Sequence, residues 1–261
     1  MSGMSGTVPV RVYNSVPGAE HAAELGLVCV VVDALRASAT VASLIGAGAE
    51  RVLIVREPDE ARAVADALRA EGGRVWLVGE RNGVMLPGYD RGNEPAEGER
   101  LDGTVVFTST NCAACCLAAA DAPALMLGTT VNATAVAQMA AEMANTRGVG
   151  IGLIMGGFSW IESRLNFEDM LACGAIIERG GFRPDNDAAK AALYSFRYVT
   201  AAGLERQFRE TEHGRMLMEL GRQVDIEYCA RLDVLRVVPV RERTFSLADA
   251  RVVEMRGREV R

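Results

Sequence analysis

The chain lacks the features that mark several large protein classes. Its 28 basic and 34 acidic residues are interspersed and give a net charge of −6, so no basic stripe is available to neutralise many nucleic-acid phosphates. No apolar run reaches the ~18 residues needed to cross a bilayer, and the first ten residues lack the pattern of a signal peptide. We therefore expect a cytoplasmic protein that binds neither nucleic acid nor membrane.

Motifs of several enzyme classes are also missing. Neither G-x-G-x-x-G nor G-x-x-x-x-G-K-[ST] occurs, which argues against a dinucleotide-binding fold and a nucleotide-binding loop. The two histidines, His21 and His213, do not follow a predicted strand, and no G-x-S-x-G turn is present. These absences exclude a Ser-His-Asp hydrolase. Among the six cysteines, Cys29 and Cys173 lie in apolar segments, so we expect no disulfide framework.

The chain is long and apolar enough to form one large core. It has 261 residues, of which 49% are hydrophobic, and it contains no Pro/Ser-rich linker, low-complexity tract or shift in composition. We therefore expect one domain over residues 1–261.

Short apolar runs alternate with helix-like segments through most of the chain. The predicted strands are residues 27–33, 51–55, 74–78, 104–107, 124–127 and 149–155, and helices are expected between them. This order predicts an α/β fold with a mostly parallel sheet covered by helices on both faces. Residues 187–232 read as nearly continuous helix in two or three pieces packed on the same core, and residues 234–240 as a strand before a charged tail.

Ligands of such sheets bind outside the carboxyl ends of the strands, where helices begin. The first predicted strand is followed by Asp33, Arg36, Ser38 and Thr40. A carboxylate suits Mg²⁺, and a guanidinium binds two oxygens of a phosphoryl group. The alternative is an Asp33 that caps the next helix while Arg36 lies on a solvated face.

A polar loop of about seventeen residues follows the third strand, which is long for a connection inside a compact domain. It carries Glu80, Arg81, Asn82, Asp90 and Asn93 between glycines. We interpret it as a loop that shapes a ligand site; a plain exposed hairpin is the alternative.

The strand at 104–107 is followed by Thr108, Thr110, Asn111 and Cys112, which form either an anion cradle or a cluster of helix-capping residues. Cys112 at a helix start is a candidate nucleophile, but small-residue packing is the commoner role. No second Cys or His group with metal-ligand spacing exists in the sequence, which argues against zinc.

Two adjacent acids, Glu168 and Asp169, open a later helix. They bind a metal or activate a water if they reach the same edge as Asp33. Alternatively they only complement the helix dipole.

Five segments in this order resemble the 2-phosphosulfolactate phosphatase family. They are DALRASAT (33–40), GERNG (79–83), GYDRGNEP (88–95), TSTN (108–111) and FEDMLACGAI (167–176), and the resemblance extends over residues 213–215 and 225–239. It implies a three-layer α/β/α sandwich, a homodimer or higher homo-oligomer, and a Mg²⁺-dependent phosphatase. The implied reaction releases phosphate from 2-phospho-3-sulfolactate, a step on the route to coenzyme M.

The chain also departs from the family pattern. Family members generally carry TTTNGTR, whereas residues 108–114 read TSTNCAA; Ala39 replaces a hydroxyl residue, and Glu94 stands where serine is common. Most of these changes remove a donor or add negative charge, so we expect weaker affinity for a substrate that carries phosphate, sulfonate and carboxylate.

Three hypotheses remain. In the first, Asp33, Glu168 and Asp169 hold Mg²⁺, two arginines bind the phosphoryl group of a small anionic substrate, and a further acid takes the proton of the attacking water. The arginines are Arg36 and Arg81, the further acid is Glu80 or Asp90, and the remaining candidate substrate ligands are Ser38, Asn82, Asn93, Thr108, Thr110, Asn111 and Cys112. In the second, a degenerate member binds an anionic metabolite with little or no turnover. In the third, the chain is an unrelated α/β enzyme that acts on a non-phosphorylated acid.

Overall fold

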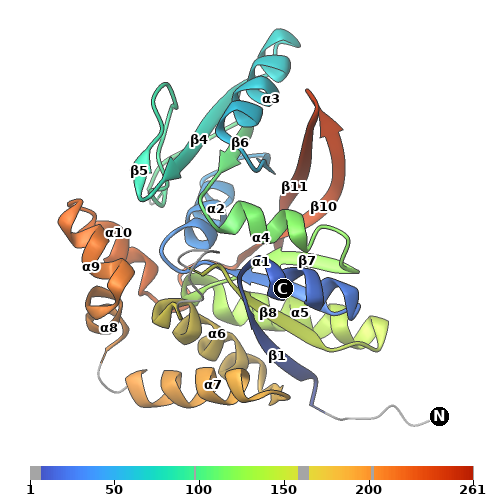
Figure 1. Ribbon diagram of the computed structural model, residues 1–261, viewed down its shortest axis with the longest axis vertical. Coiled ribbons are helices and arrows are strands. Elements are labelled where there is room, and N and C mark those ends of the chain that lie inside the picture. Colours follow the sequence, from blue (N-terminus) through green and yellow to red (C-terminus); the bar gives the residue numbers. More distant parts are fainter. Residues whose placement is uncertain (1–6, 97, 158–164, 201–202, 261) are drawn as a thin grey trace.

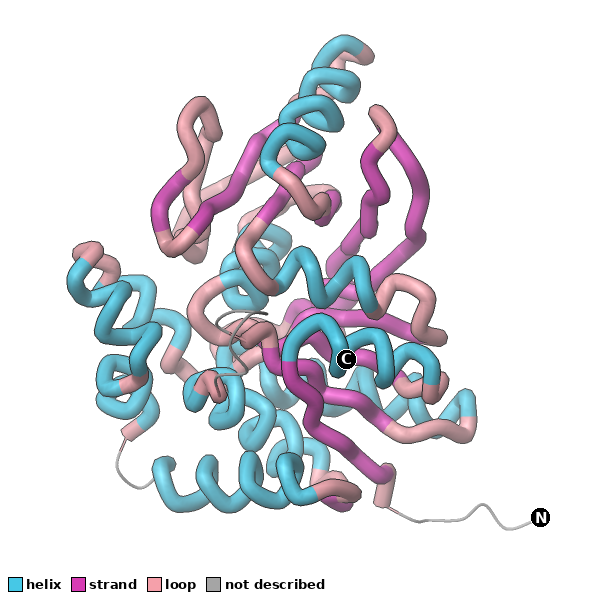
Figure 2. Tube along the Cα trace, viewed as in Figure 1, coloured by secondary structure: helices cyan, strands magenta, loops and turns pink. Residues whose placement is uncertain are grey.

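A computed structural model describes residues 7–96, 98–157, 165–200 and 203–260, and shows a central sheet with helices on both faces (Figures 1 and 2). The described strands form one 11-stranded sheet in the order β5-β4-β6-β3-β11-β10-β7-β2-β8-β1-β9. Their bounds are β1 Pro9–Asn14, β2 Val28–Val32, β3 Arg51–Ile54, β4 Val75–Arg81, β5 Val84–Met85, β6 Thr104–Thr108, β7 Ala124–Leu127, β8 Ile151–Met155, β9 Arg183–Pro184, β10 Val237–Leu247 and β11 Ala250–Glu259. The predicted α/β fold with a mostly parallel sheet is confirmed.

The sheet consists of two parallel blocks joined by an antiparallel hairpin. One block contains β4, β6 and β3, and the other contains β7, β2, β8 and β1. The hairpin of β10 and β11 lies between them and pairs antiparallel with β7 on one side and β3 on the other. Three successive antiparallel pairings therefore make the strands of the two blocks run in opposite directions within the sheet. Figure 1 shows β4 and β6 in the upper part of the molecule and β8 and β1 in the lower part.

Helices complete the three layers. Their bounds are α1 Ser15–Glu24, α2 Ala37–Gly46, α3 Pro58–Ala70, α4 Cys112–Ala118, α5 Ala133–Arg147, α6 Phe167–Gly180, α7 Asp187–Thr200, α8 Leu204–Glu210, α9 Glu212–Glu219 and α10 Gln223–Cys229. Helices α1, α2 and α4 pack on one face of the sheet, and α3, α5 and α6 pack on the other, with α7 against α6.

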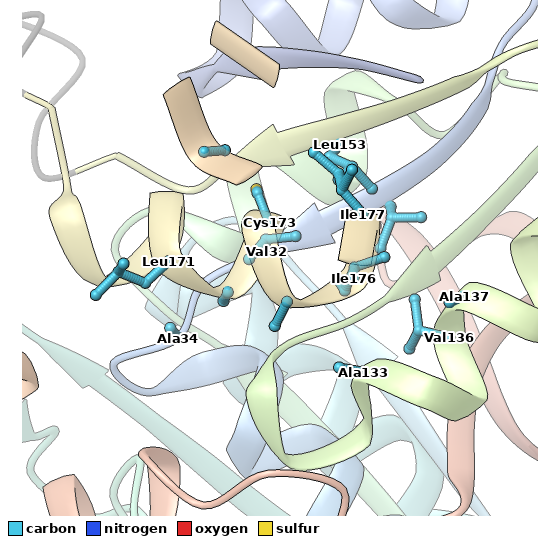
Figure 3. Close-up of a cluster of buried hydrophobic side chains, with 14 of the residues drawn as sticks. Val32, Ala34, Ala133, Val136, Ala137, Leu153, Leu171, Cys173, Ile176 and Ile177 are labelled. Carbon is cyan, nitrogen blue, oxygen red and sulfur yellow. The ribbon is translucent and has the colours of Figure 1, made fainter. Parts of the chain in front are cut away.

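The valine-rich strand β2 shows why the central strands are apolar throughout. Its side chains alternate between the two faces, and both faces are buried, so every residue from Val28 to Val32 is buried. Figure 3 shows one of these faces, where Val32 and Leu153 of the sheet meet Cys173, Ile176 and Ile177 of α6. No described helix is both long and apolar enough to cross a membrane.

The C-terminal third differs in detail from its prediction. In its described residues the helical region contains four helices rather than two or three, and the predicted strand at 234–240 begins at Val237. The region expected as a charged tail forms most of the central hairpin. Its charges pair across the strands, since Glu254 of β11 binds Arg243 of β10 at 2.9 Å, while Val252, Val253 and Met255 are buried. Strand β1 and helix α1 were not predicted.

Candidate functional site

The ends of strands from both blocks meet at one small pocket. Its volume is about 60 Å³, and its lining comes from the ends of β2, β4 and β6, from the polar loop, and from α9. The lining residues are Asp33, Leu35, Arg36, Glu80, Asn82, Gly83, Asn93, Thr110, Asn111, His213 and Met216. The structure therefore brings together seven of the predicted residues: Asp33, Arg36, Glu80, Asn82, Asn93, Thr110 and Asn111.

Asp33 occupies the turn between β2 and α2. One carboxylate oxygen, Oδ1, accepts a hydrogen bond from the amide of Ala37 at 3.2 Å, and the amide of Asp33 donates to Ser38 Oγ at 3.0 Å. Ser38 thus holds the turn and does not line the pocket. Gly156 at the end of β8 approaches closely, because a Cβ atom there would lie 3.1 Å from Asp33 Cβ. A larger residue at this position would displace the Asp33 side chain.

Three carboxylates gather at the ends of β2 and α6. Asp33, Glu168 and Asp169 are only 8%, 1% and 2% exposed. Asp169 Oδ1 accepts a hydrogen bond from the amide of Ala34 at 2.7 Å, and this bond ties α6 to the turn after β2. Both predicted acids at the start of α6 therefore reach the edge where Asp33 lies, although neither lines the pocket directly.

The electrostatics of this cluster favour a nearby cation. Burial raises the pKa of Asp33 to about 6, an effect that His213 opposes and that Glu80 and Glu168 reinforce. Burial also raises the pKa of Asp169 well above its ordinary range, and the charges of Asp33 and Glu168 add to this shift. The carboxylates are thus buried close enough to one another to repel.

His213 enters the pocket from α9, far along the sequence from the strand ends. Its Nδ1 atom lies 3.3 Å from Glu168 Oε1. Helix α9 begins after Thr211, whose hydroxyl accepts a hydrogen bond from the amide of Gly214 at 2.9 Å. The strand-end criterion missed His213; the family-like segment at residues 213–215 was the sequence signal that could have identified it.

Arg36 lines the pocket but is already bound within the protein. Its Nη1 atom lies 2.5 Å from Asp225 Oδ2, and its Nη2 atom donates to the carbonyl of Gly83 at 3.0 Å. The peptide bond between Leu35 and Arg36 is cis. Asp225, on α10, was another contributor that the strand-end criterion missed.

Glu80 ties two polar loops together. Its Oε2 atom accepts a hydrogen bond from the amide of Gly83 at 2.8 Å, and its Oε1 atom accepts from the amide of Thr110 at 2.8 Å and from the Thr110 hydroxyl at 3.1 Å. Asn82 has a φ of 53°, the left-handed conformation that asparagine tolerates better than most residues. Glu80 thereby sets the shape of the pocket on the side of β4 and β6.

Two charged residues of the polar loop lie outside the pocket lining. Arg81, next to Glu80 in β4, donates from Nη2 to the carbonyl of Arg56 at 2.8 Å and to the hydroxyl of Thr108 at 3.1 Å. Asp90 accepts hydrogen bonds from the amide of Leu77 at 2.7 Å and from Arg69 at 3.0 Å. These contacts anchor the loop to the sheet and to α3.

The segment that departs most from the family pattern is part of the core. Cys112, Ala113 and Cys115 at the start of α4 are fully buried within an apolar cluster. A contact with the Cys116 thiol and burial together raise the pKa of the Cys112 thiol well above its ordinary value, which opposes a thiolate nucleophile. All six cysteines are free, as expected.

Glu94, the second notable departure, is paired. Its Oε1 atom lies 2.8 Å from Arg222, the residue before α10. Its negative charge is therefore balanced by a residue of the C-terminal helices.

The donor set fits a cation that keeps part of its water shell. Among the described residues, no three His, Cys, Asp or Glu side chains form a group that could hold a metal ion by themselves. Mg²⁺ does not require such a group, because it is usually bound by one or two carboxylates together with waters and substrate phosphate. Buried carboxylates with raised pKa values beside a phosphate-sized pocket match that kind of site.

Comparison with known proteins agrees with this geometry. The model of the family described as "2-phosphosulpholactate phosphatase" matches residues 14–244. The chain belongs to the 2-phosphosulfolactate phosphatase family. Members of this family are phosphoric monoester hydrolases, which rules out the unrelated α/β enzyme considered above.

Several curated relatives cover most of the chain. A probable 2-phosphosulfolactate phosphatase of Carboxydothermus hydrogenoformans is 34% identical over 211 residues, which are 80% of this chain and 84% of the relative. Proteins with the same name from Deinococcus radiodurans and Symbiobacterium thermophilum are 34% and 33% identical, and cover 81% and 87% of this chain and 86% and 95% of their own lengths. The residues matched by the family, 14–244, include strands of both blocks of the sheet.

Proposed function

We propose that the chain is a Mg²⁺-dependent phosphatase that hydrolyses 2-phosphosulfolactate, or a related small phosphorylated acid, to the alcohol and phosphate. The observation that carries this proposal is the pocket itself, in which buried carboxylates face an arginine and several amide and hydroxyl groups. Its volume of about 60 Å³ suits a single phosphoryl group rather than a polymer.

Asp33, Glu168 and Asp169 supply the carboxylates that would hold Mg²⁺, one or two of them as direct ligands beside waters, because the three do not form a complete metal-binding group by themselves. Their burial and the raised pKa values of Asp33 and Asp169 support this assignment, because a divalent cation would relieve their repulsion. When bound, the cation would neutralise charge on the phosphoryl oxygens and favour attack by water.

Arg36, Asn82, Asn93 and Asn111 would bind the phosphoryl oxygens, while Thr110, whose amide and hydroxyl both donate to Glu80, would keep that carboxylate in place. A guanidinium and neutral donors are the groups that bind such oxygens most effectively. Asn93 has an Oδ1 atom that is buried without a hydrogen-bond partner among the described residues, and as an acceptor this atom would bind a water or a hydroxyl of the ligand, while only the Asn93 amide nitrogen could donate to a phosphoryl oxygen. Buried polar atoms are nearly always bonded, so an unbonded amide beside a pocket is expected to bind a ligand or water.

His213 and Glu80 would move protons. His213 lines the pocket with Glu168 behind it, an arrangement that orients the imidazole to donate a proton to the departing ester oxygen. Glu80 lines the same pocket and is the acid that would take the proton of the attacking water. The water would replace the longest of its four hydrogen bonds, which the Thr110 hydroxyl donates to Oε2 at 3.3 Å.

Three further properties are proposed from the family resemblance alone: a place on the route to coenzyme M, a cytoplasmic location, and a homodimer or higher homo-oligomer. Light scattering on the purified chain would test the last of these, and a monomer at all concentrations would contradict it.

Phosphate release tests the proposal directly. Purified chain is incubated with 2-phosphosulfolactate and, separately, with para-nitrophenyl phosphate, each with Mg²⁺ and with EDTA. We expect release with Mg²⁺, none with EDTA, and none from Asp33→Asn in either condition. If wild type and Asp33→Asn released phosphate equally slowly, the chain would instead be the member with little or no turnover.

A further inference from the structure

Asp225 does not line the pocket, yet it holds a side chain that does. Its Oδ2 atom lies 2.5 Å from Arg36 Nη1, and the two side chains are only 13% and 2% exposed. The carbonyl of Gly83 accepts a hydrogen bond from Arg36 Nη2 at 3.0 Å. Both terminal nitrogens of the guanidinium are therefore fixed by the protein, and the remaining N–H groups of Arg36 are left for a ligand.

Helix α10, which carries Asp225, is docked on the polar loop of the pocket. Arg222 binds Glu94, the neighbour of Asn93 in that loop, at 2.8 Å. Helix α9 packs against the turn that contains Gly83, since a Cβ atom at Gly83 would lie 2.9 Å from Leu220 Cδ1. The position of Asp225 relative to Arg36 is thus determined by contacts on both sides of the pair.

We propose that Asp225 is a positioning residue that keeps the guanidinium of Arg36 directed toward the bound phosphoryl group. This inference rests on the proposed role of Arg36 as a phosphate ligand. Asp33 and Glu80 line the same pocket and are competing acceptors for an arginine that has lost its partner. A guanidinium binds two oxygens only in one fixed orientation, so a rotated Arg36 loses the phosphoryl contact.

The test compares Asp225→Asn with wild type in the full chain with Mg²⁺. The measurements are kcat and KM for para-nitrophenyl phosphate and the inhibition constant of inorganic phosphate. We expect KM and the inhibition constant to rise by about ten- to a hundredfold, the loss caused by one misplaced charge-assisted hydrogen bond. The value of kcat should change little, because binding of substrate and transition state is weakened alike. Asp225→Glu, which keeps the charge, should restore part of the affinity.

Glu227→Gln is the matched control. Glu227 lies on the same helix and binds Arg209 of α8 at 2.6 Å, so the substitution removes the same charge and an ion pair that is more exposed and does not contact Arg36. We expect its kinetic constants and phosphate affinity to equal those of wild type. Melting temperatures of all variants separate loss of affinity from loss of folded protein.

Unchanged phosphate affinity in folded Asp225→Asn would overturn the inference, as would an equal loss in Glu227→Gln. If Asp225→Asn does not fold, the inference is tested with Asp225→Glu instead. An inhibition constant equal to that of wild type in Asp225→Glu would show that the position of the carboxylate does not matter and would contradict the inference. The wild type could bind phosphate without releasing it from substrates, and Asp225→Asn could bind phosphate more weakly than wild type. That result would contradict the proposed activity and support this inference. A wild type that does not bind phosphate at all would defeat both.

Discussion

The two parallel blocks of the sheet bring different chemistry to the pocket. On the side of β2 and β8, Asp33 and Asp169 are buried carboxylates whose pKa values are raised, which means that their negative charge is poorly compensated. On the side of β4 and β6, Glu80 is a carboxylate already bonded to the backbone and hydroxyl groups around it. The first side is therefore suited to a cation, and the second to shaping a cradle of donors for an anion.

These groups meet although the strands of the two blocks run in opposite directions. In a wholly parallel sheet the carboxyl ends share one edge, but here the β10–β11 hairpin reverses the direction between blocks. The ends of β2 and β4 nevertheless line one pocket. Each block thus supplies one half of the site, and the five predictions below test the two halves and the core beside them.

The largest effect is expected from Asp169→Asn, which removes charge from the carboxylate side. We expect kcat/KM to fall by about 10²–10³-fold, the usual cost of losing one group that stabilises the charge of the transition state. The metal-free variant should melt no lower than wild type, because repulsion by Asp33 and Glu168 is relieved. Steady-state kinetics and thermal melting check both points. Full activity in the folded variant would contradict the assignment of the cation to the carboxylate side of the pocket.

A somewhat smaller effect is expected from His213→Gln, which changes the residue that lies between the halves. Proton transfer by a positioned side chain contributes about 10²–10⁴-fold, and we expect kcat to fall by about a hundredfold, the lower end of that range. The change in KM should be small, and Asn111→Ala on the donor side provides the contrast, with its effect mainly on KM. A His213→Gln variant that lost only affinity would assign this histidine to the donor side.

The pH dependence of stability tests the carboxylate side of the pocket in the absence of substrate. The pKa of Asp33 is raised from 3.8 to about 6 in the folded state, so the folded protein binds more protons than the unfolded chain in that interval. The free energy of unfolding of metal-free protein should therefore fall as pH rises through this window, by on the order of 3 kcal/mol for this one group. Urea unfolding in EDTA measures it, with Asp33→Asn as the reference that lacks this contribution. Identical pH profiles for the two proteins would show that the charged form of Asp33 does not destabilise the folded protein.

The smallest effect is expected from Cys112→Ala, which changes the buried start of α4. Because burial and the Cys116 thiol raise the pKa of Cys112, no thiolate is available at neutral pH, and activity should stay within roughly twofold of wild type. Stability should fall by about 1 kcal/mol through lost packing. A drop of a hundredfold or more in kcat for the folded variant would support the hypothesis that Cys112 is a nucleophile.

Much of the fold was predictable because the central strands carry a strong local signal. The buried runs around Val30, Val106 and Leu153 have few polar residues, and turns follow them, so both the strands and the polar residues after them could be placed. The central hairpin could not be predicted in this way. Its alternating arginines and glutamates resemble a solvated tail, and only pairing across the strands, as between Arg243 and Glu254, reveals a sheet.

Side-chain direction limited the prediction of the site. Glu80 and Arg81 are neighbours in β4, and successive side chains of a strand point to opposite sides. The sequence therefore could not show that Glu80 lines the pocket while Arg81 binds Arg56 and Thr108 elsewhere. His213 and Asp225 depend on how distant helices dock against the sheet, which no local pattern records.

Binding of Mg²⁺ tests the contrast between the two sides most directly. The shift in melting temperature on adding Mg²⁺ is measured for wild type, for Asp33→Asn on the carboxylate side and for Asn93→Ala on the donor side. We predict that Mg²⁺ raises the melting temperatures of wild type and Asn93→Ala and does not change that of Asp33→Asn. A ligand that binds the folded state but not the unfolded state stabilises the folded state. An equal shift in all three proteins, or none in wild type, would contradict the assignment of the cation to the buried carboxylates.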